Sequence, residues 1–369
     1  MSLRDEIVTV IRRDGPIPFS RYMRMCLYHA ELGYYSRTRE KFGKSGDFYT
    51  SSDVHAVFGR LLCRQFEEMW RALGTPAQID LIELGPGRGL FAQDVLDWAG
   101  KKFPEFAKAL RYRLVESSPS LWERLRERFA RDSRVALYAE LEAAAEDCGE
   151  ALIVFGNEFF DAIPVDIISG IGELRVAERD GNFTEEWVRP AQEHLDFLKQ
   201  YSVHPQENER LETSMESQAW MQRIAALFEK RRGFAIFIDY GYTRDQQLAG
   251  RHRDTVMTFR EHRASGNPYE APGEQDITAH VNFTALIDAA EQGGMKNLGL
   301  VTQSQLLLGV GQATEFSDAF EACVLPQERA KVGLQLRHLI SPEDMGERFH
   351  ALVLGKGVER KLSGLEFGK

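Results

Sequence analysis

The sequence predicts an α/β protein built on a mainly parallel sheet with helices around it. Between residues 76 and 165, strand-length apolar runs alternate with amphipathic segments of helical period, as βαβ units require. The composition of the 369-residue chain, 43% hydrophobic and 28% charged, is that of a folded globular protein that can bury a full core.

Residues 1–75 predict an N-terminal helical cap. A helix is expected from Arg4 to Arg13, because Gly15 and Pro16 follow its last turn. The next segment is unusually rich in aromatic residues and lacks a strand pattern. A second helix is expected from Val54 to Leu73, where apolar residues recur with helical spacing.

Residues 76–165 predict the first part of the sheet. Strands and helices are expected to alternate in the order "IDLIEL", Leu90–Lys102, "YRLVE", Leu121–Arg131, "VALY" and "ALIVFGN". The carboxyl ends of parallel strands meet at one edge, and ligands bind in the crevice there. We therefore expect functional residues directly after these strands.

Two later regions complete the predicted chain. Residues 166–232 are expected to form an insertion that contacts the substrate, a hairpin turning at Asp180-Gly181-Asn182 and then a long helix. The sheet resumes in residues 233–369 with the buried strand "GFAIFIDYGY". The charged, turn-rich span 251–273 is expected to be a loop or lid.

Charge and composition argue against several kinds of partner and site. A net charge of −10 and a pI near 5.5 disfavour nucleic acid. The longest apolar runs have strand length, so no membrane span is predicted. The four cysteines form no CxxC pair and the histidines have no ligand spacing, so no metal site is expected. No signal-peptide core opens the chain, and a cytoplasmic location is expected.

The stretch "LIELGPGRG", residues 81–89, breaks from an apolar run into a glycine-rich loop. A P-loop needs four residues between its glycines and then Lys-Ser or Lys-Thr, which Arg88-Gly89-Leu90 does not supply. A dinucleotide-binding loop has the spacing G-x-G-x-x-G, whereas these glycines alternate with single residues. Neither phosphate-binding motif therefore fits.

The same loop resembles the first motif of class I (Rossmann-like) S-adenosylmethionine (SAM) methyltransferases. The matching residues are Glu83, Gly85, Pro86, Gly87 and Gly89. Glycines allow the backbone to approach the methionine part of SAM, and Glu83 places a carboxylate near its cationic end. The alternative is a tight β-to-α turn with a structural role only.

Polar residues also follow the next predicted strands. Glu116 ends the second strand, where a carboxylate can accept hydrogen bonds from both ribose hydroxyls, although it can equally be an acidic strand cap in water. Asn157 ends the strand "ALIVFGN", Glu158 follows it directly, and Asp161 lies just beyond. A carboxylate there could bind a guanidinium bidentately and orient one nitrogen towards the methyl group. The alternative is that Asn157 caps a helix.

Eight ordered blocks resemble one family, the MidA-like methyltransferases. They are "GPIPFSRYM", "GYY", "GDFYTSSDVHAVFG", "LIELGPGRG", "LVESSPSL", "NEFFDAIPVD", "IDYG" and "PGEQDITAHVNF". Mitochondrial members of that family are complex I assembly factors that dimethylate an arginine of a complex I subunit. The resemblance implies an arginine-bearing protein substrate here too, with a subunit of a respiratory complex as one possible partner, and leaves the oligomeric state open.

The resemblance also implies roles for individual residues. The N-terminal segment over the cofactor pocket would include Gly46, Asp47, Phe48, Thr50 and Ser51, and SAM would be held by Glu83, Gly85, Pro86, Gly87, Gly89, Glu116 and Asn157. Asn157, Glu158 and Asp161 would face the methyl acceptor and act in catalysis.

The sequence departs from the family pattern at two places. Ser52-Asp53 stands where Pro-Glu is expected, and Asn282 stands where Asp is expected. Losing a carboxylate at Asn282 would alter recognition of a cationic acceptor. A small-molecule N- or O-methyltransferase is therefore an alternative function, as is an assembly chaperone that binds SAM without turnover. Because the family motif begins at Gly15, without room for a presequence, a bacterial protein is expected.

Overall fold

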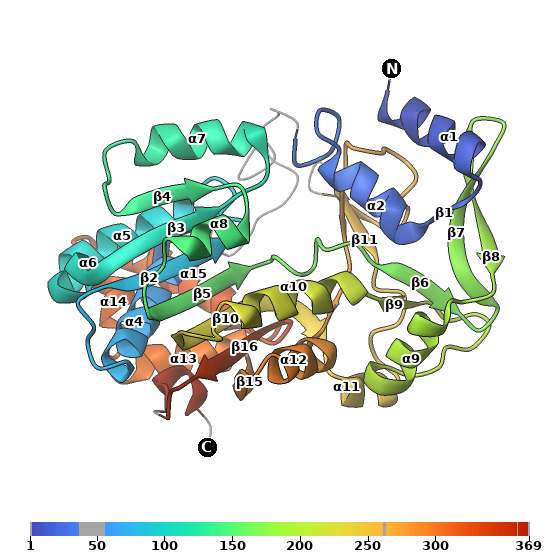
Figure 1. The fold of residues 1–369 in the computed structure, drawn as a ribbon. Coiled ribbons are helices and arrows are strands. Elements are labelled where there is room, and N and C mark those ends of the chain that lie inside the picture. Colours follow the sequence, from blue (N-terminus) through green and yellow to red (C-terminus); the bar gives the residue numbers. More distant parts are fainter. Residues whose placement is uncertain (1, 37–55, 261–262, 360, 368–369) are drawn as a thin grey trace. The chain divides into compact units, whose positions relative to one another are not determined.

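The computed structural model describes residues 2–36, 56–260, 263–359 and 361–367. The chain forms two compact units, and Figure 1 labels most of their elements. The core unit comprises the described residues within Tyr49–Phe159, Arg223–Tyr240 and Ala290–Lys369. The cap unit comprises those within Met1–Phe48, Phe160–Gln222 and Gly241–Ala289.

The core unit contains a twisted sheet of seven strands in the order β15-β16-β10-β5-β2-β3-β4. Strands β10, β5, β2, β3 and β4 are parallel, whereas β16 is antiparallel to both of its neighbours. The strands are β2 (Ile79–Leu84), β3 (Leu110–Val115), β4 (Val135–Tyr138), β5 (Ala151–Asn157), β10 (Arg232–Tyr242), β15 (Lys296–Thr302) and β16 (Phe349–Lys356). This confirms the predicted α/β fold with a mainly parallel sheet.

The order of these strands identifies the edge where a ligand is expected. Numbered along the chain, the first five strands of the sheet have the order 3-2-1-4-5, as in doubly wound folds. The order reverses between β2 and β5, and ligands of such folds bind at the carboxyl ends of the two strands at this switch point. The loops after β2, β3 and β5 are therefore the first place to look for a site.

Helices surround this sheet and bury its central strands. They are α4 (Ala56–Ala72), α5 (Leu90–Lys102), α6 (Pro104–Ala109), α7 (Pro119–Phe129), α8 (Leu141–Glu146), α13 (Gln303–Gln312), α14 (Ser317–Phe320) and α15 (Pro326–Ile340), with the short 3-10 helix η1 (Ser363–Leu365). Every residue of β2 is buried, as expected for a parallel strand covered on both faces. The predicted helix Leu90–Lys102 is found with the same bounds.

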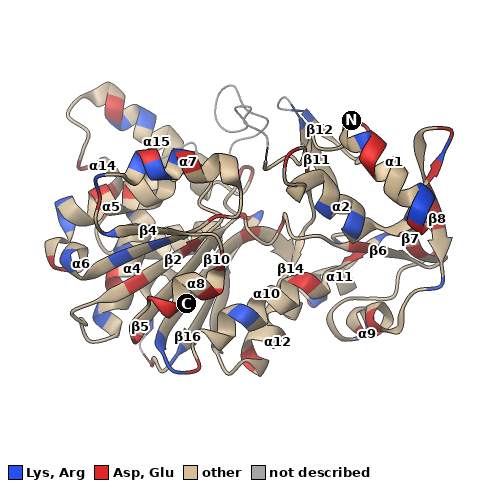
Figure 2. Cartoon of the chain, turned by 45° about the horizontal axis from the view of Figure 1, so that its top comes forward, with Lys and Arg blue, Asp and Glu red and all other residues tan. Residues whose placement is uncertain are grey.

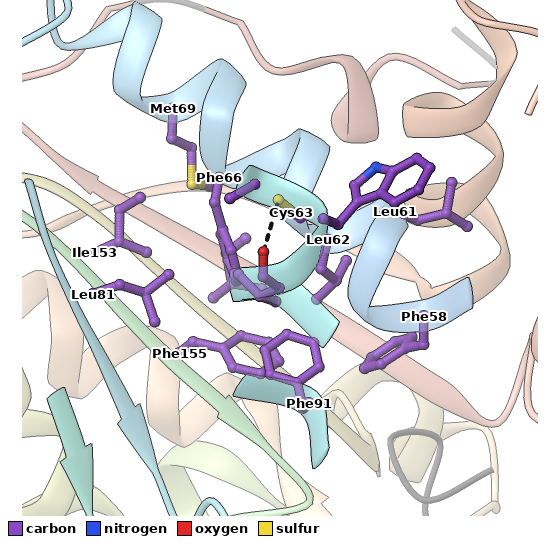
Figure 3. Packing of buried hydrophobic residues seen from close by; sticks show 14 of the residues in the cluster. Phe58, Leu61, Leu62, Cys63, Phe66, Met69, Leu81, Phe91, Ile153 and Phe155 are labelled. Atoms are coloured by element: carbon purple, nitrogen blue, oxygen red, sulfur yellow. Dashed lines mark hydrogen bonds between the residues drawn. The ribbon is translucent and has the colours of Figure 1, made fainter. Parts of the chain in front are cut away.

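The largest hydrophobic cluster lies between the sheet and the helices α4 and α5 (Figure 3). Phe91 of α5 stacks on Phe155 of β5 with ring centroids 4.5 Å apart. Phe66 of α4 meets Phe155 edge-on at 5.5 Å, and all three side chains are buried. Because α5 begins directly after the glycine loop, this packing holds the loop against the end of β2.

The cap unit contains two smaller sheets and several helices. One sheet has the order β1-β7-β6-β9 with β8 also paired to β7, and the other has the order β12-β11-β13. The strands are β1 (Ile17–Pro18), β6 (Asp166–Ser169), β7 (Gly172–Arg179), β8 (Asn182–Val188), β9 (Leu211–Thr213), β11 (Met257–Arg260), β12 (Arg263–Ser265), β13 (Asp276–Thr278) and β14 (Val281–Asn282). The helices are α1 (Leu3–Asp14), α2 (Phe19–Tyr28), α9 (Gln192–Tyr201) and α11 (Arg244–Leu248).

Three elements continue across the boundaries between the units. They are α10 (Met215–Ala226), β10 and α12 (Phe283–Gln292). The last two residues of β10, Gly241 and Tyr242, pair with β14 inside the cap unit.

The predicted hairpin of the insertion is present. Strands β7 and β8 pair antiparallel, with Arg179 opposite Asn182. Asp180 and Gly181 between them have φ angles of 52° and 83°. Two positive φ angles are what a two-residue hairpin turn of type I′ requires.

The units divide the chain differently from the boundaries expected from sequence. Helix α4 was expected in an N-terminal cap of residues 1–75, but it packs on α5 in the core unit. Its apolar face is wide enough to cover the sheet, and periodicity does not reveal which surface such a face meets. The span 251–273, expected to be a loop or lid, contributes β11 and β12 to a sheet of the cap unit.

Charged residues of both signs occur together along α5, α6 and α7 (Figure 2). Such mixing gives no extended basic surface on these helices, in keeping with the acidic balance of the chain. In the described part of the chain, none of the helices has the length and apolar character needed to cross a bilayer.

Candidate functional site

The glycine loop joins the end of β2 to the start of α5. Gly85, Gly87 and Gly89 have φ angles of 61°, 53° and 71°, a region that side chains with a Cβ rarely adopt. The Gly85 amide donates to the carbonyl oxygen of Val115 at 3.0 Å, which ties the loop to the end of β3. The backbone of this loop therefore needs glycine at all three positions.

Two of these glycines have different surroundings. A Cβ on Gly89 would lie 2.7 Å from Leu125 and 2.8 Å from Phe129, both on α7. A Cβ on Gly87 would meet no atom of the described residues within 4 Å. Gly89 thus permits close packing inside the protein, while Gly87 has open space beside it that a ligand can approach.

Glu83 lies one residue before the end of β2 and is 4% exposed. Its carboxyl group accepts a hydrogen bond of 2.7 Å from the hydroxyl of Tyr112 on β3. Burial raises the pKa of Glu83 to about 8, while the Tyr112 hydroxyl opposes that shift. A cation bound beside this carboxyl would lower its pKa, so Glu83 can respond to the charge of a ligand.

Glu116 directly follows β3 and is 8% exposed. One carboxylate oxygen accepts a hydrogen bond of 2.8 Å from the amide of Ser118, at the start of α7. Its own amide donates to the Tyr138 carbonyl oxygen at 3.0 Å. The carboxylate is thus held in a fixed position at the strand end, and it contributes to the N-terminal hydrogen bonding of α7 as well.

Asn157 and Glu158 lie at the end of β5. The Asn157 amide group donates to the Glu158 carboxylate at 2.8 Å. Glu158 has a φ of 51°, and its own amide donates to the Ile238 carbonyl oxygen at 2.9 Å. Asn157 does not cap a helix, since the next regular element is β6. A non-glycine residue with positive φ costs free energy, and such strain is concentrated at functional sites.

Sheet register brings the three strand ends together. Leu84 of β2 pairs with Val115 of β3 on one side and with Gly156 of β5 on the other. The residues that follow these three positions are Gly85, Glu116 and Asn157. The predicted cofactor residues of three different strands therefore share one row at the carboxyl edge of the sheet.

The remaining predicted residues are placed differently. Asp161 belongs to the cap unit, where it is 5% exposed and its carbonyl oxygen accepts from the Ala279 amide at 3.0 Å. The predicted segment with Gly46, Asp47, Phe48, Thr50 and Ser51 lies outside the described residues, as does Ser52-Asp53.

Asn282, where the family pattern led us to expect Asp, has two hydrogen bonds in the cap unit. Its side-chain oxygen accepts from the Ala285 amide at 3.1 Å, at the start of α12. Its side-chain amide donates to the Tyr201 carbonyl oxygen at 3.0 Å. An aspartate could make the first bond, but an ionised carboxylate cannot donate the second.

Some buried polar groups of the cap unit were not singled out from the sequence. Glu212 and Tyr242 line the same small pocket as His280 and Asn282. The first two come from β9 and the end of β10, far from the "DITAH" block in the sequence. A buried acid inside "RLETS" was the one signal available, and it does not stand out among 56 acidic residues.

The residues at the sheet edge fit SAM. The loop is open beside Gly87, the buried carboxyl of Glu83 can balance a positive charge, and the Glu116 carboxylate is held at the neighbouring strand end. Within the described residues, no group of three or more His, Cys, Asp and Glu side chains could hold a metal ion.

Comparison with protein families gives a clear match. A family model described as S-adenosyl-L-methionine-dependent methyltransferase matches residues 61–301. A relative from Drosophila melanogaster, "Protein arginine methyltransferase NDUFAF7 homolog, mitochondrial", is 31% identical over 97% of this chain and 85% of its own length. The Homo sapiens protein of that type is 26% identical over 93% of this chain and 81% of its own length.

Solved structures agree with these relatives. A protein from Burkholderia thailandensis, crystallised with S-adenosyl-homocysteine, is 28% identical and superposes with a TM-score of 0.81. The match covers 98% of this chain and 94% of the other. A native crystal structure from the same organism gives a TM-score of 0.82 over 99% of this chain.

Proposed function

The chain belongs to a family of S-adenosyl-L-methionine-dependent methyltransferases, and from this premise we propose that it methylates an arginine side chain of a protein. SAM is the methyl donor and S-adenosylhomocysteine (SAH) the product. The acceptor is supported by relatives named as protein arginine methyltransferases, which align over most of this chain. The resemblance makes a subunit of a respiratory complex the first protein to test.

The observation that carries the proposal is the row of Gly85, Glu116 and Asn157 at the switch point of the sheet. We assign Glu83, Gly85, Pro86, Gly87, Gly89, Glu116 and Asn157 to the cofactor. The glycine backbone would contact the methionine part, and the fixed Glu116 carboxylate would accept hydrogen bonds from the ribose hydroxyls. Gly46, Asp47 and Thr50 are proposed as further cofactor residues.

When bound, SAM supplies an electrophilic methyl group. The protein has to align the acceptor nitrogen with that group, exclude water and remove a proton from the nitrogen. The Glu158 carboxylate is held by the Asn157 side chain and its backbone amide by Ile238 of β10, so the carboxylate is preorganised to pair with a guanidinium. We propose that Asn157, Glu158 and Asp161 have these roles towards the acceptor.

A methylation experiment tests the proposal. Purified enzyme and SAM with a labelled methyl group are incubated with cell extract, label is separated by size, and the protein fraction is hydrolysed for amino-acid analysis. Labelled methylarginine is expected, with a large loss in Glu158→Gln. Label only in small molecules would contradict a protein acceptor. SAM binding without any transfer would support a non-catalytic role instead.

A further inference from the structure

The cap unit has a pocket of its own, lined by residues from five stretches of the chain. It is small and partly open to solvent. Its polar lining residues are Glu212, Ser214, Ser217, Tyr242, His280 and Asn282. Phe160 and Phe197 are among its apolar lining residues.

Glu212 is a buried acid in this pocket, with 3% of its surface exposed. One carboxylate oxygen accepts a hydrogen bond of 2.8 Å from the Thr255 amide. The other, Oε2, is buried and has no hydrogen-bond partner among the described residues. Nor does any described cationic side chain form an ion pair with Glu212. Burial raises its pKa to about 7, while hydrogen bonds from Thr255 oppose that shift.

Tyr242 presents a second buried polar atom to the same pocket. Its side chain is 1% exposed, and its hydroxyl lies within the influence of the polar side chains of Asn282 and Gln247. The ring stacks on His252 with centroids 5.2 Å apart, and His252 contacts His280 through their Nδ1 atoms at 3.0 Å. His252 has a φ of 55°, so this cluster is held together at some cost in backbone strain.

A buried carboxylate oxygen without a hydrogen-bond partner among the described residues is unusual, because proteins satisfy nearly all such groups. The polar groups that line the pocket are mostly hydrogen-bond acceptors, namely a carboxylate oxygen and hydroxyl oxygens. Aromatic rings lie beside them. A planar cation with several N–H donors matches this set, since guanidinium groups bind carboxylates and stack on aromatic rings.

We propose that the Glu212 pocket binds the guanidinium group of a substrate arginine. This inference rests on the proposed function for the identity of the cation, but its observations are independent of the cofactor site. Glu212 is assigned as the counter-charge of the guanidinium, and Tyr242 as a hydrogen-bonding partner that also offers its ring face.

A binding experiment with a small probe tests this pocket directly. N-acetyl-L-arginine methylamide is titrated into the full chain loaded with SAH, and binding is followed by saturation-transfer NMR. The uncharged citrulline analogue and the lysine analogue are titrated in parallel. We expect the arginine probe to bind and the citrulline probe not to bind.

Two variants test whether the arginine probe binds at Glu212. Glu212→Gln keeps an oxygen for the Thr255 amide but removes the charge, and it should weaken the arginine probe about tenfold or more. Glu193→Gln, on the exposed side of α9, changes the net charge equally and should have no effect. SAH affinity should be the same in all three proteins, which also shows that they are folded.

The outcomes separate this inference from the proposed function. Equal probe binding by wild type and Glu212→Gln, or none by wild type at millimolar concentration, would overturn the inference. Equal binding of the lysine probe would overturn the guanidinium assignment. If binding of the arginine probe depends on Glu212 but no protein acquires methylarginine, the pocket assignment is supported and the proposed function is contradicted. If the Glu212→Gln variant methylates proteins at the wild-type rate, the proposed function is supported and the pocket assignment is contradicted.

Discussion

The negative charge of the ionised Glu83 side chain opposes folding when no ligand is bound. Its pKa is raised from an ordinary 4.5 to about 8 by burial, so the folded protein keeps a proton that the unfolded chain releases above pH 4.5. The free energy of unfolding should therefore fall as pH rises from about 4.5 to 8, by several kcal/mol at about 1.4 kcal/mol per pKa unit.

Comparison with Glu83→Gln isolates this effect, because the amide does not titrate. Urea unfolding at several pH values from 5 to 8 should show wild type losing stability relative to the variant. A constant difference between the two proteins over this range would mean that Glu83 is ionised in the folded state.

Gly87 and Gly89 provide a matched pair of substitutions in one loop. Alanine at either position has to adopt a positive φ, which costs about 1–2 kcal/mol. At Gly89 the new Cβ also meets Leu125 and Phe129 on α7, so we expect a total loss of about 2–4 kcal/mol in the free energy of unfolding. Gly87→Ala should lower the free energy of unfolding by only about 1 kcal/mol. It should nevertheless weaken SAH binding, because the new Cβ points into the open space beside the loop. Urea unfolding and calorimetric titration measure the two effects, and equal destabilisation would contradict the packing explanation.

Helix α5 and strand β5 are joined by the stacked rings of Phe91 and Phe155. Replacing either ring with leucine should destabilise the protein, and the pair should show a coupling of about 0.5–1.5 kcal/mol beyond the area buried. A double-mutant cycle measured by urea unfolding gives this coupling. Additive effects would mean that the two rings contribute only by filling space.

The regular elements follow closely from the sequence where a local rule determines them. Helix α5 and the β7–β8 hairpin were predicted because a glycine loop, helical periodicity and an Asp-Gly-Asn turn act over a few residues. The strands β11 and β12 were missed because their span is charged and short of apolar residues. Pairing with β13 stabilises them, and such distant pairing leaves no local pattern.

The residues of the candidate site also fall into two groups, those that the sequence predicts and those that it does not. Gly85, Glu116 and Asn157 could be found because each lies at the carboxyl end of a strand whose hydrophobic pattern is unmistakable. Glu212 and Tyr242 could not, since their significance lies in being buried polar residues that line one pocket, and burial of a polar residue depends on the packed structure.

At the level of the whole molecule, the two units are interleaved along the chain. The segments of the cap unit alternate with those of the core unit, and β10, α10 and α12 each continue from one unit into the other. Unfolding one unit would disrupt elements that complete the other. We therefore expect both to unfold in a single cooperative transition, unlike units joined by a simple linker.

Ligand linkage tests this cooperativity. SAH at one hundred times its dissociation constant should stabilise the folded state by about 2.7 kcal/mol. If unfolding is cooperative, hydrogen exchange of the slowest amides in the cap strands β6 and β7 should slow by the same free energy as that of β2 and β5, although the proposed SAH site is built from core strands. Glu116→Ala should abolish the effect in both units, whereas Glu123→Ala, an exposed residue of α7, should preserve it. Slowing confined to the core strands would show that the cap unit unfolds separately.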